Sequence, residues 1–288
     1  MKQISILGLG LMGGSLGLAI KQRMPGVKVH GYARAERTRS EAVKRGAVDR
    51  VFDKPELAVE DSDLVVLCTP VLTMPALLEA AAPNLKINAI VTDVGSTKVD
   101  VMKSLAEILS STASALVGSH PIAGSEETGI DVARTNLYEN AVTIVCPQPG
   151  HEPLAAAMVS GFWAGLGAQP ITMDAAQHDA LLAKTSHLPH LVAALLVQSV
   201  LGDKNLNPAQ FCGPGFRDST RIAAGSEDMW HDIVKTNRGP IQTELEGFRT
   251  HLDALITLVK AGNTDGIKDW LSKNRQTRQS LESTQSGK

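Results

Sequence analysis

The segment Ile4-Ser5-Ile6-Leu7-Gly8-Leu9-Gly10-Leu11-Met12-Gly13 decides the fold of this 288-residue chain. A short apolar strand runs into a G-x-G-x-x-G motif that opens a helix, which is the setting that a dinucleotide-binding turn requires. Gly8 permits the tight turn, Gly10 lets the backbone approach a pyrophosphate, and Gly13 lets helix and strand pack closely. The free N–H groups of the helix start face the anion. We therefore assign to the cofactor site Gly8, Leu9, Gly10, Leu11, Met12 and Gly13.

The motif alone is weak evidence for a dinucleotide site, since a purely structural glycine turn can have the same sequence. The pattern of the surrounding segments is therefore needed to predict the fold. Short apolar runs alternate with amphipathic segments up to residue 173. This alternation predicts a parallel sheet covered by helices on both faces. We expect a doubly wound, mostly parallel Rossmann domain over residues 1–173, with strands at residues 4–7, 27–32, 63–68, 89–94, 115–117, 142–146 and 169–173.

The second half of the chain, residues 174–288, is expected to be an all-α domain for substrate binding and dimerisation. Residues 174–201 and 241–261 carry apolar side chains at helical spacing. In the second of these segments a wide stripe predicts a homodimer interface, and it consists of Leu245, Phe248, Leu252, Leu255, Ile256 and Val259. The polar tail 276–288 has no apolar period and is expected to fray.

Composition excludes several classes of function. With 28 basic and 30 acidic side chains the formal net charge is -2, so nothing calls for a nucleic-acid or membrane partner. Cys68, Cys146 and Cys212 form no C-x-x-C pair and are expected to be reduced thiols. The histidines show no metal-ligand spacing, so no metal is assigned. No signal-like segment and no run near the ~20 apolar residues of a membrane span were found, which favours a cytoplasmic protein.

The end of the second strand bears on cofactor choice. Enzymes that use NAD place a carboxylate about 20 residues past the last glycine, where it binds the ribose 2′-hydroxyl. Here that position holds Ala33, while Arg34 and Arg37 follow and offer planar, permanently charged groups to a 2′-phosphate. We predict NADP, with NAD left open because Glu36 could reach a ribose. The end of the next strand, Cys68, Thr69 and Pro70, completes the expected cofactor site.

Four further segments go beyond a generic dinucleotide-binding fold: residues 92–98 (TDVGSTK), 118–126 (GSHPIAGSE), 186–190 (SHLPH) and 215–221 (GFRDSTR). In this order, over about residues 3–260, the chain resembles the prephenate/arogenate dehydrogenase family of tyrosine biosynthesis. That family removes a hydride from the ring carbon bearing the hydroxyl of a cyclohexadienol. Carbon dioxide leaves the opposite carbon, and the ring becomes aromatic.

The resemblance implies a role for each matching residue. It makes His120 the catalytic base for the ring hydroxyl, Ser96 its orienting partner and Arg221 the cation that holds a substrate carboxylate. It also implies that the pocket walls contain Ser125, Glu126, Ser186, His190 and Trp230.

Chemistry considered independently supports these assignments. Forming a carbonyl from an alcohol needs a base with a pKa near working pH, which histidine supplies. His120 follows the apolar run 115–117 and is therefore expected at the carboxyl end of the sheet, where open α/β sheets bind ligands. Asp218 lies three residues before Arg221 on an expected helix and can orient it. Ser186 and His190 share a helix face, and Pro189 is expected to kink that helix.

Two alternatives remain open at this stage. A 3-hydroxyacid dehydrogenase has the same glycine-rich start and a helical second domain, and Lys184 would be its catalytic lysine. A non-catalytic NADP-binding regulator would need the cofactor turn alone. The first alternative leaves the His120 segment without a role, and absorbance at 340 nm with NADP and substrate separates the second from an enzyme.

Overall fold

A computed structural model describes the chain apart from residues 126, 149, 151–152, 203–207 and 287–288, and side chains are described up to residue 281. The chain forms two compact units, Met1–Ile241 and Gln242–Lys288. This division, at residues 241/242, differs from the predicted domain boundary at residues 173/174. That boundary stays a prediction.

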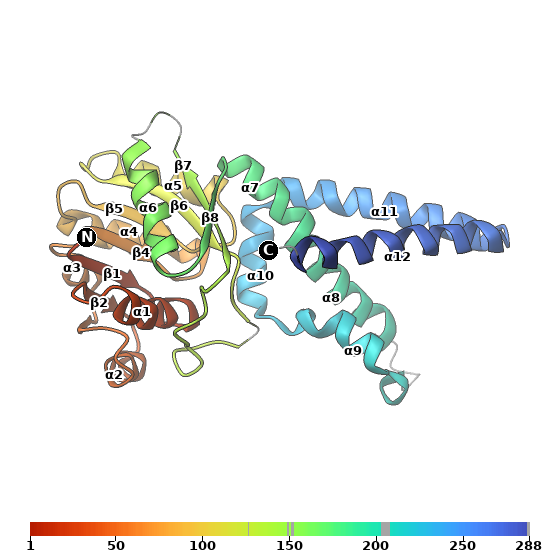
Figure 1. Cartoon of the computed structure of the whole chain (residues 1–288), viewed down its shortest axis with the longest axis horizontal. Coiled ribbons are helices and arrows are strands. Elements are labelled where there is room, and N and C mark those ends of the chain that lie inside the picture. Colours follow the sequence, from red (N-terminus) through yellow and green to blue (C-terminus); the bar gives the residue numbers. More distant parts are fainter. Residues whose placement is uncertain (126, 149, 151–152, 203–207, 287–288) are drawn as a thin grey trace. The chain divides into compact units, whose positions relative to one another are not determined.

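One eight-stranded sheet organises the first unit, in the order β3-β2-β1-β4-β5-β6-β7-β8 (Figure 1). Its strands are β1 (Gln3–Leu7), β2 (Lys28–Tyr32), β3 (Arg50–Phe52), β4 (Leu64–Leu67), β5 (Ile90–Asp93), β6 (Ala115–Pro121), β7 (Val142–Pro147) and β8 (Gln169–Thr172). The β6–β7 pair is antiparallel and the other neighbours are parallel. The expected mostly parallel sheet is confirmed, and β3 is a strand that the sequence pattern did not predict.

Helices cover both faces of this sheet. On one face lie α1 (Leu11–Arg23), α2 (Glu36–Lys44) and α6 (Pro153–Gly165), and on the other α3 (Pro55–Ala58), α4 (Met74–Ala81) and α5 (Val99–Leu109). Side chains alternate between the two cores with a period of two: Ile4 and Ile6 pack with the first set, and Leu7 with the second. Burial on both faces explains why the strands are apolar throughout.

The helical part of the first unit begins at Asp174, whose side chain accepts a hydrogen bond from Gln177 N and caps α7. The elements that follow are α7 (Ala175–Leu182), a π-helical turn η3 (Ala183–His187), α8 (Leu188–Leu201), η4 (Pro208–Phe211), α9 (Pro214–Thr220), η5 (Arg221–Ala224) and α10 (Glu227–Thr236). Pro189 lies in the first turn of α8, directly after the π turn. The expected irregularity therefore precedes Pro189, at the π turn.

The second unit is built from most of α11 (Arg238–Lys260) and from α12 (Thr264–Ser286). The expectation of a frayed tail is wrong for most of its length, because α12 continues through residues 276–286. On α11 four residues of the predicted stripe are exposed, Leu245, Leu252, Ile256 and Val259.

The segment Ala175–Leu201 is long and apolar enough to cross a membrane by length and composition, with a mean hydropathy of 1.4 over its most apolar window. This corrects the expectation that no run approaches that length. Its first half carries buried polar side chains, His178, Asp179 and His187, which bond to other parts of the same unit. These contacts make that half a core helix of the unit.

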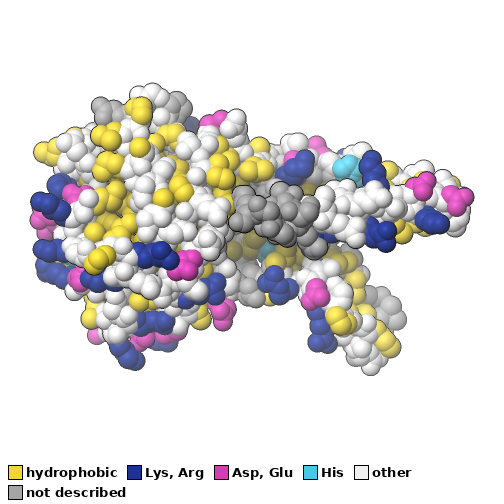
Figure 2. Space-filling view, viewed as in Figure 1, with side chains coloured by type: hydrophobic (Ala, Val, Ile, Leu, Met, Phe, Trp, Pro, Cys, Tyr) yellow, Lys and Arg dark blue, Asp and Glu magenta, His cyan; other side chains and the backbone are white. Residues whose placement is uncertain are grey.

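The outer surface mixes charges of both signs. Figure 2 shows dark-blue Lys and Arg side chains lying beside magenta Asp and Glu side chains over the region of α1 and α2. One such pair joins Lys21 to Asp49 at 2.6 Å. On the face shown, this interspersion agrees with the small net charge.

Candidate active site

A cleft of about 740 Å³ opens at the carboxyl ends of the parallel strands. Its walls come from three places: the glycine turn, the ends of β4 to β6 with the loop after β6, and a helical wall made by the end of α7, the π turn η3 and α10 with the two residues before it. The predicted site residues that line it are Gly10, Leu11, Met12, Cys68, Ser96, His120, Ser125, Ser186 and Trp230.

The glycine turn has the shape that a pyrophosphate needs. A Cβ on Gly13 would lie 1.8 Å from the Gly8 carbonyl oxygen, so only glycine lets α1 start this close to β1. A Cβ on Gly10 would meet nothing within 4 Å, which leaves the backbone open on the cleft side. Beside the turn, the buried Thr69 Oγ1 has no hydrogen-bond partner among the residues that the structure describes. An open backbone turn and an unsatisfied hydroxyl fit a dinucleotide phosphate.

At the end of β2, Ala33 is buried and Arg34 is exposed. Arg39 donates to the carbonyl oxygens of both residues, at 2.9 and 2.6 Å, and so holds the shape of this loop. Arg37 pairs with Asp131 at 2.8 Å across the surface. Within the described residues, the Arg34 guanidinium has no such partner, so it is the arginine of this loop that is available to a ligand.

His120 lies inside β6, opposite Ile144 of β7, and not after the strand as the sequence predicted. The strand extends through Pro121 because β7 pairs with it there, beyond the last residues that it shares with β5. Burial, followed by the charges that His178, Lys98 and His187 would carry, holds the pKa of His120 well below its ordinary value. The ring is therefore neutral at neutral pH.

The hydrogen bond that orients His120 comes from a residue that sequence reasoning missed. His120 Nδ1 lies 2.9 Å from His178 Nε2, and His178 Nδ1 lies 2.8 Å from Asp179 Oδ1. Ser96, the predicted orienting partner, lines the same cleft, but the described ring bond of His120 is with His178. The only signal in the sequence was a His–Asp pair inside an otherwise apolar helix.

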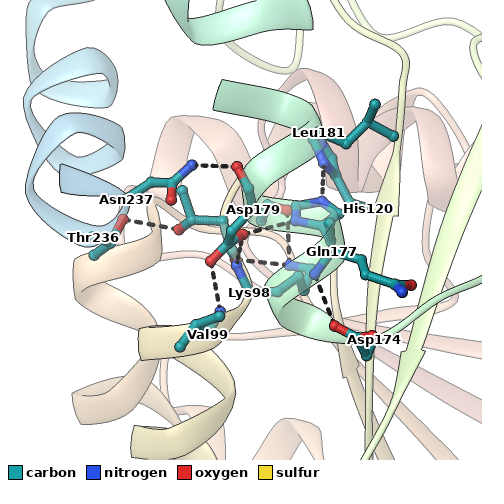
Figure 3. Close-up of polar contacts among 12 residues, drawn as sticks. Lys98, Val99, His120, Asp174, Gln177, Asp179, Leu181, Thr236 and Asn237 are labelled. Carbon is teal, nitrogen blue, oxygen red and sulfur yellow. Dashed lines mark hydrogen bonds and ion pairs between the residues drawn. The ribbon is translucent and has the colours of Figure 1, made fainter. Parts of the chain in front are cut away.

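Asp179 also connects the helical part to the sheet. Its carboxylate accepts from Lys98 N at 2.7 Å and Val99 N at 2.9 Å, at the start of α5 (Figure 3). Its backbone oxygen accepts from Asn237 Nδ2 at 2.8 Å. These groups all bond to one residue, so α5, α7 and the end of α10 are fixed relative to one another.

A buried ion pair shapes the loop that carries Ser96. Lys98 Nζ donates to Asp93 Oδ2 at 2.5 Å, and both side chains are fully buried. Lys98 Nζ also donates to the carbonyl oxygens of Gly95 and Thr97, at 2.8 and 3.0 Å. A buried ion pair needs such additional bonds to offset its desolvation, and here they order the loop around Ser96.

On the helical wall, Trp230 lines the cleft, whereas His190 stacks on Trp230 and does not line it. The two rings are stacked, with centroids 3.5 Å apart and planes at 13°. The edge of His187 packs on the same tryptophan, and burial lowers the pKa of His187 to about 4. Asn237 Nδ2 donates to His187 Nδ1 at 3.1 Å. His190 therefore supports the wall that Ser186 and Trp230 present.

Other predicted residues lie apart from this cleft or cannot be placed. Asp218 in α9 and Arg221 at the start of η5 are exposed and are not among the residues that line it. Glu126 lies outside the described residues. Lys184, which a 3-hydroxyacid dehydrogenase would need, is exposed and does not line the cleft either. Among the described residues, no group of three or more His, Cys, Asp or Glu side chains is placed to hold a metal ion.

Comparison with known proteins connects both halves of the chain to one family. Residues 16–172 match the nucleotide-binding domain of prephenate dehydrogenase, and residues 174–273 match its dimerization domain. A cyclohexadienyl dehydrogenase of Zymomonas mobilis is 35% identical over 283 residues, covering 97% of this chain and 96% of that protein. A prephenate dehydrogenase of Bacillus subtilis is 33% identical, covering 99% of this chain and 77% of its own length.

Solved structures agree with these relatives. A prephenate dehydrogenase of A. aeolicus, in complex with hydroxyphenyl propionate and NAD+, superposes with a TM-score of 0.91 at 30% identity, covering 98% of both chains. An arogenate dehydrogenase of Synechocystis gives a TM-score of 0.83 at 30% identity, covering 97% of this chain and 99% of that one. Because family models match both halves and the relatives span almost the whole chain, this protein belongs to the prephenate dehydrogenase family that its motifs resembled.

Proposed function

We propose that the protein oxidises and decarboxylates prephenate, arogenate or both, with hydride transfer to NADP or NAD, and releases 4-hydroxyphenylpyruvate or tyrosine. One observation supports this above all. The glycine turn and His120 line the same cleft as Ser186 and Trp230 of the helical part. A dinucleotide on the turn and a ring substrate against the helices would therefore meet at a neutral histidine.

In this proposal His120 is the general base. Its Nδ1 is bonded to His178, which leaves Nε2 for the substrate hydroxyl. The O–H bond breaks as the ring carbonyl forms, and Nε2 holds the proton. The bound dinucleotide would supply the acceptor for the hydride. Closure of the cleft by apolar groups, Val94 and Ile233 among them, would exclude water.

The remaining site residues have positioning and binding roles in the proposal. Arg221 would hold a substrate carboxylate, with Asp218 to orient its guanidinium. Ser96 would lie beside the reacting ring, because the buried ion pair orders its loop at the cleft wall. The substrate walls would be formed by Ser125, Glu126, Ser186, His190 and Trp230.

The cofactor site would consist of the turn Gly8 to Gly13, the end of β2 and the end of β4, where Cys68, Thr69 and Pro70 lie. We propose a preference for NADP. Ala33 brings no negative charge to the position next to the ribose, and the exposed Arg34 has no competing partner among the described residues. Arg37 would first have to leave Asp131.

We propose that the protein works as a cytoplasmic homodimer through its helical part. Large apolar side chains are exposed on α8 and, separately, on α11 and α12, as expected for a protein interface. On α8 these are Leu195 and Leu201, on α11 Leu252 and Val259, and on α12 Trp270 and Leu271.

The test is a side-by-side assay at 340 nm with prephenate and arogenate, each with NADP and NAD. Turnover of either substrate supports the proposal. Binding of NADP by calorimetry with no turnover of either one would instead support a non-catalytic regulator. A control without protein measures the background absorbance at 340 nm.

A further inference from the structure

We propose that His178 and Asp179 are positioning residues that fix the tautomer of His120, so that its Nε2 lone pair faces the cleft. The expected effect on turnover rests on the proposed function, whereas the tautomer follows from the hydrogen bonds alone. Three side chains stand in line, with Asp179 joined to His178 at 2.8 Å and His178 joined to His120 at 2.9 Å.

The direction of each hydrogen bond follows from the far end of this line. A carboxylate only accepts, so His178 Nδ1 must carry the proton that it donates to Asp179. A neutral imidazole has one N–H, so His178 Nε2 is an acceptor. His120 Nδ1 must then be the donor to His178, which leaves His120 Nε2 without a proton. A base needs this tautomer, because the opposite one would present an N–H to the substrate hydroxyl.

Burial makes the arrangement strict. His178 is fully buried, Asp179 is 2% exposed and His120 is 9% exposed, so water cannot easily replace a lost partner. Asp179 is itself held by the backbone N–H groups of Lys98 and Val99. A carboxylate fixed on two sides cannot turn away from His178.

The same line stabilises the product of proton transfer. When Nε2 takes the proton from the hydroxyl, His120 becomes an imidazolium whose Nδ1–H still donates to His178. The negative charge of Asp179 is then two hydrogen bonds away from His120, through His178, and offsets the new positive charge. The other charged or titratable groups around the pair are Lys98 and Asp93 of the β5–α5 segment and His187 of the π turn. No proton needs to pass beyond His120, which returns it through the cleft.

A structural role is the competing explanation, because Asp179 also accepts from the first backbone N–H groups of α5. Three variants separate the two. Asp179→Asn can donate its amide to His178 Nδ1 and so reverse every bond in the line. His178→Phe ends the line. His178→Gln preserves it, since its amide oxygen can accept from His120 and its amide N–H can donate to Asp179.

The expected results follow from the direction of the bonds. Turnover should fall at least ~100-fold in Asp179→Asn and His178→Phe, while KM and the dissociation constant of the cofactor stay within about twofold. His178→Gln should recover to within ~10-fold of the wild type. Matched controls are His231→Gln and Asp232→Asn. These two residues are also adjacent in sequence, their side chains lie 3.2 Å apart on the surface, and neither lines the cleft. Both controls should retain full turnover.

A second measurement reads the tautomer without any turnover. In ¹⁵N-histidine-labelled protein, the His120 ring, assigned by its loss in His120→Asn, should show a protonated Nδ1 and a bare Nε2. In Asp179→Asn the two should exchange. A wild-type His120 protonated at Nε2 would overturn the inference, as would Asp179→Asn that loses thermal stability but keeps its turnover per folded molecule. If the wild type turns over neither prephenate nor arogenate, the proposed function fails and the ¹⁵N spectra still decide the tautomer.

Discussion

At the scale of single residues, a substitution of His120 tests catalysis separately from cofactor binding. His120→Asn keeps a hydrogen-bonding side chain of similar size but removes the proton acceptor. We expect turnover to fall by ~100-fold to 10,000-fold, with cofactor affinity little changed, measured at 340 nm and by calorimetry. His251→Asn replaces an exposed histidine on α11 and should have no effect. A near-normal rate in His120→Asn would remove the residue from the mechanism.

Arg34 carries the prediction about cofactor choice. Arg34→Ala should weaken NADP binding by roughly 1.5 to 3 kcal/mol, since a charge-assisted contact to the 2′-phosphate is lost. NAD binding should be unchanged, and Arg37→Ala should have a smaller effect because that side chain is paired with Asp131. Lys28→Ala at the opposite end of β2 serves as the control. Equal losses for NADP and NAD, or a wild type that prefers NAD, would show that the cofactor prediction is wrong.

At the scale of elements, the contact between β1 and α1 depends on Gly13. Gly13→Ala places a methyl group 1.8 Å from a carbonyl oxygen, so the helix must move off the strand. Overpacking of this kind costs about 1 to 3 kcal/mol, or roughly 2 to 10 °C in Tm for a chain of this size. Cofactor affinity should fall as well. Gly161→Ala, within α6 and with nothing near its Cβ, should be neutral or slightly stabilising.

How far the sequence predicted these elements depended on periodicity. Continuous apolar runs such as the one that forms β4, and the glycine turn after β1, were predicted correctly because local pattern and fold agree there. The three-residue β3 is too short for a pattern, and β6 continues past its apolar run because β7 pairs with it. The tail was predicted to fray because the sequence of α12 is polar. The partnership of His120 with His178 joins residues 58 positions apart, which no local pattern encodes.

At the scale of the whole molecule, the exposed stripe on α11 predicts self-association. Leu252→Glu puts a charge at its centre, and two-fold symmetry would repeat that charge across the axis. Light scattering at micromolar concentration should give twice the chain mass of 30.5 kDa for the wild type, and a lower mass or aggregation for the variant. Thr250→Glu, on an exposed polar position of the same helix, is the control. A wild type that is monomeric at these concentrations would rule out the interface and leave the catalytic assignments untouched.

Buried histidines predict how stability depends on pH. Burial lowers the pKa of His187 from 6.5 to about 4, and it also lowers the pKa values of His120, His178 and His190. Between pH 6.5 and 4 the unfolded chain therefore binds more protons than the folded chain. The free energy of unfolding should fall as pH falls through this window, by up to ~1.4 kcal/mol per pH unit from His187, and the other three histidines act in the same direction.

Urea unfolding at a series of pH values, at one protein concentration, measures this slope. His187→Gln should reduce the slope by up to one proton. A wild-type stability that is flat from pH 7 to pH 5 would contradict the prediction.

The bond between Asp179 and the start of α5 has a consequence for how the protein is made. The first N–H groups of α5, those of Lys98 and Val99, donate to the carboxylate of Asp179, which lies about 80 residues later in the chain. The ribosome therefore releases α5 well before it releases Asp179. A nascent chain that has completed the sheet thus still lacks the group that orients its histidine. The bond from His178 that orients His120 can therefore form only after α7 has been synthesised and has docked against the start of α5.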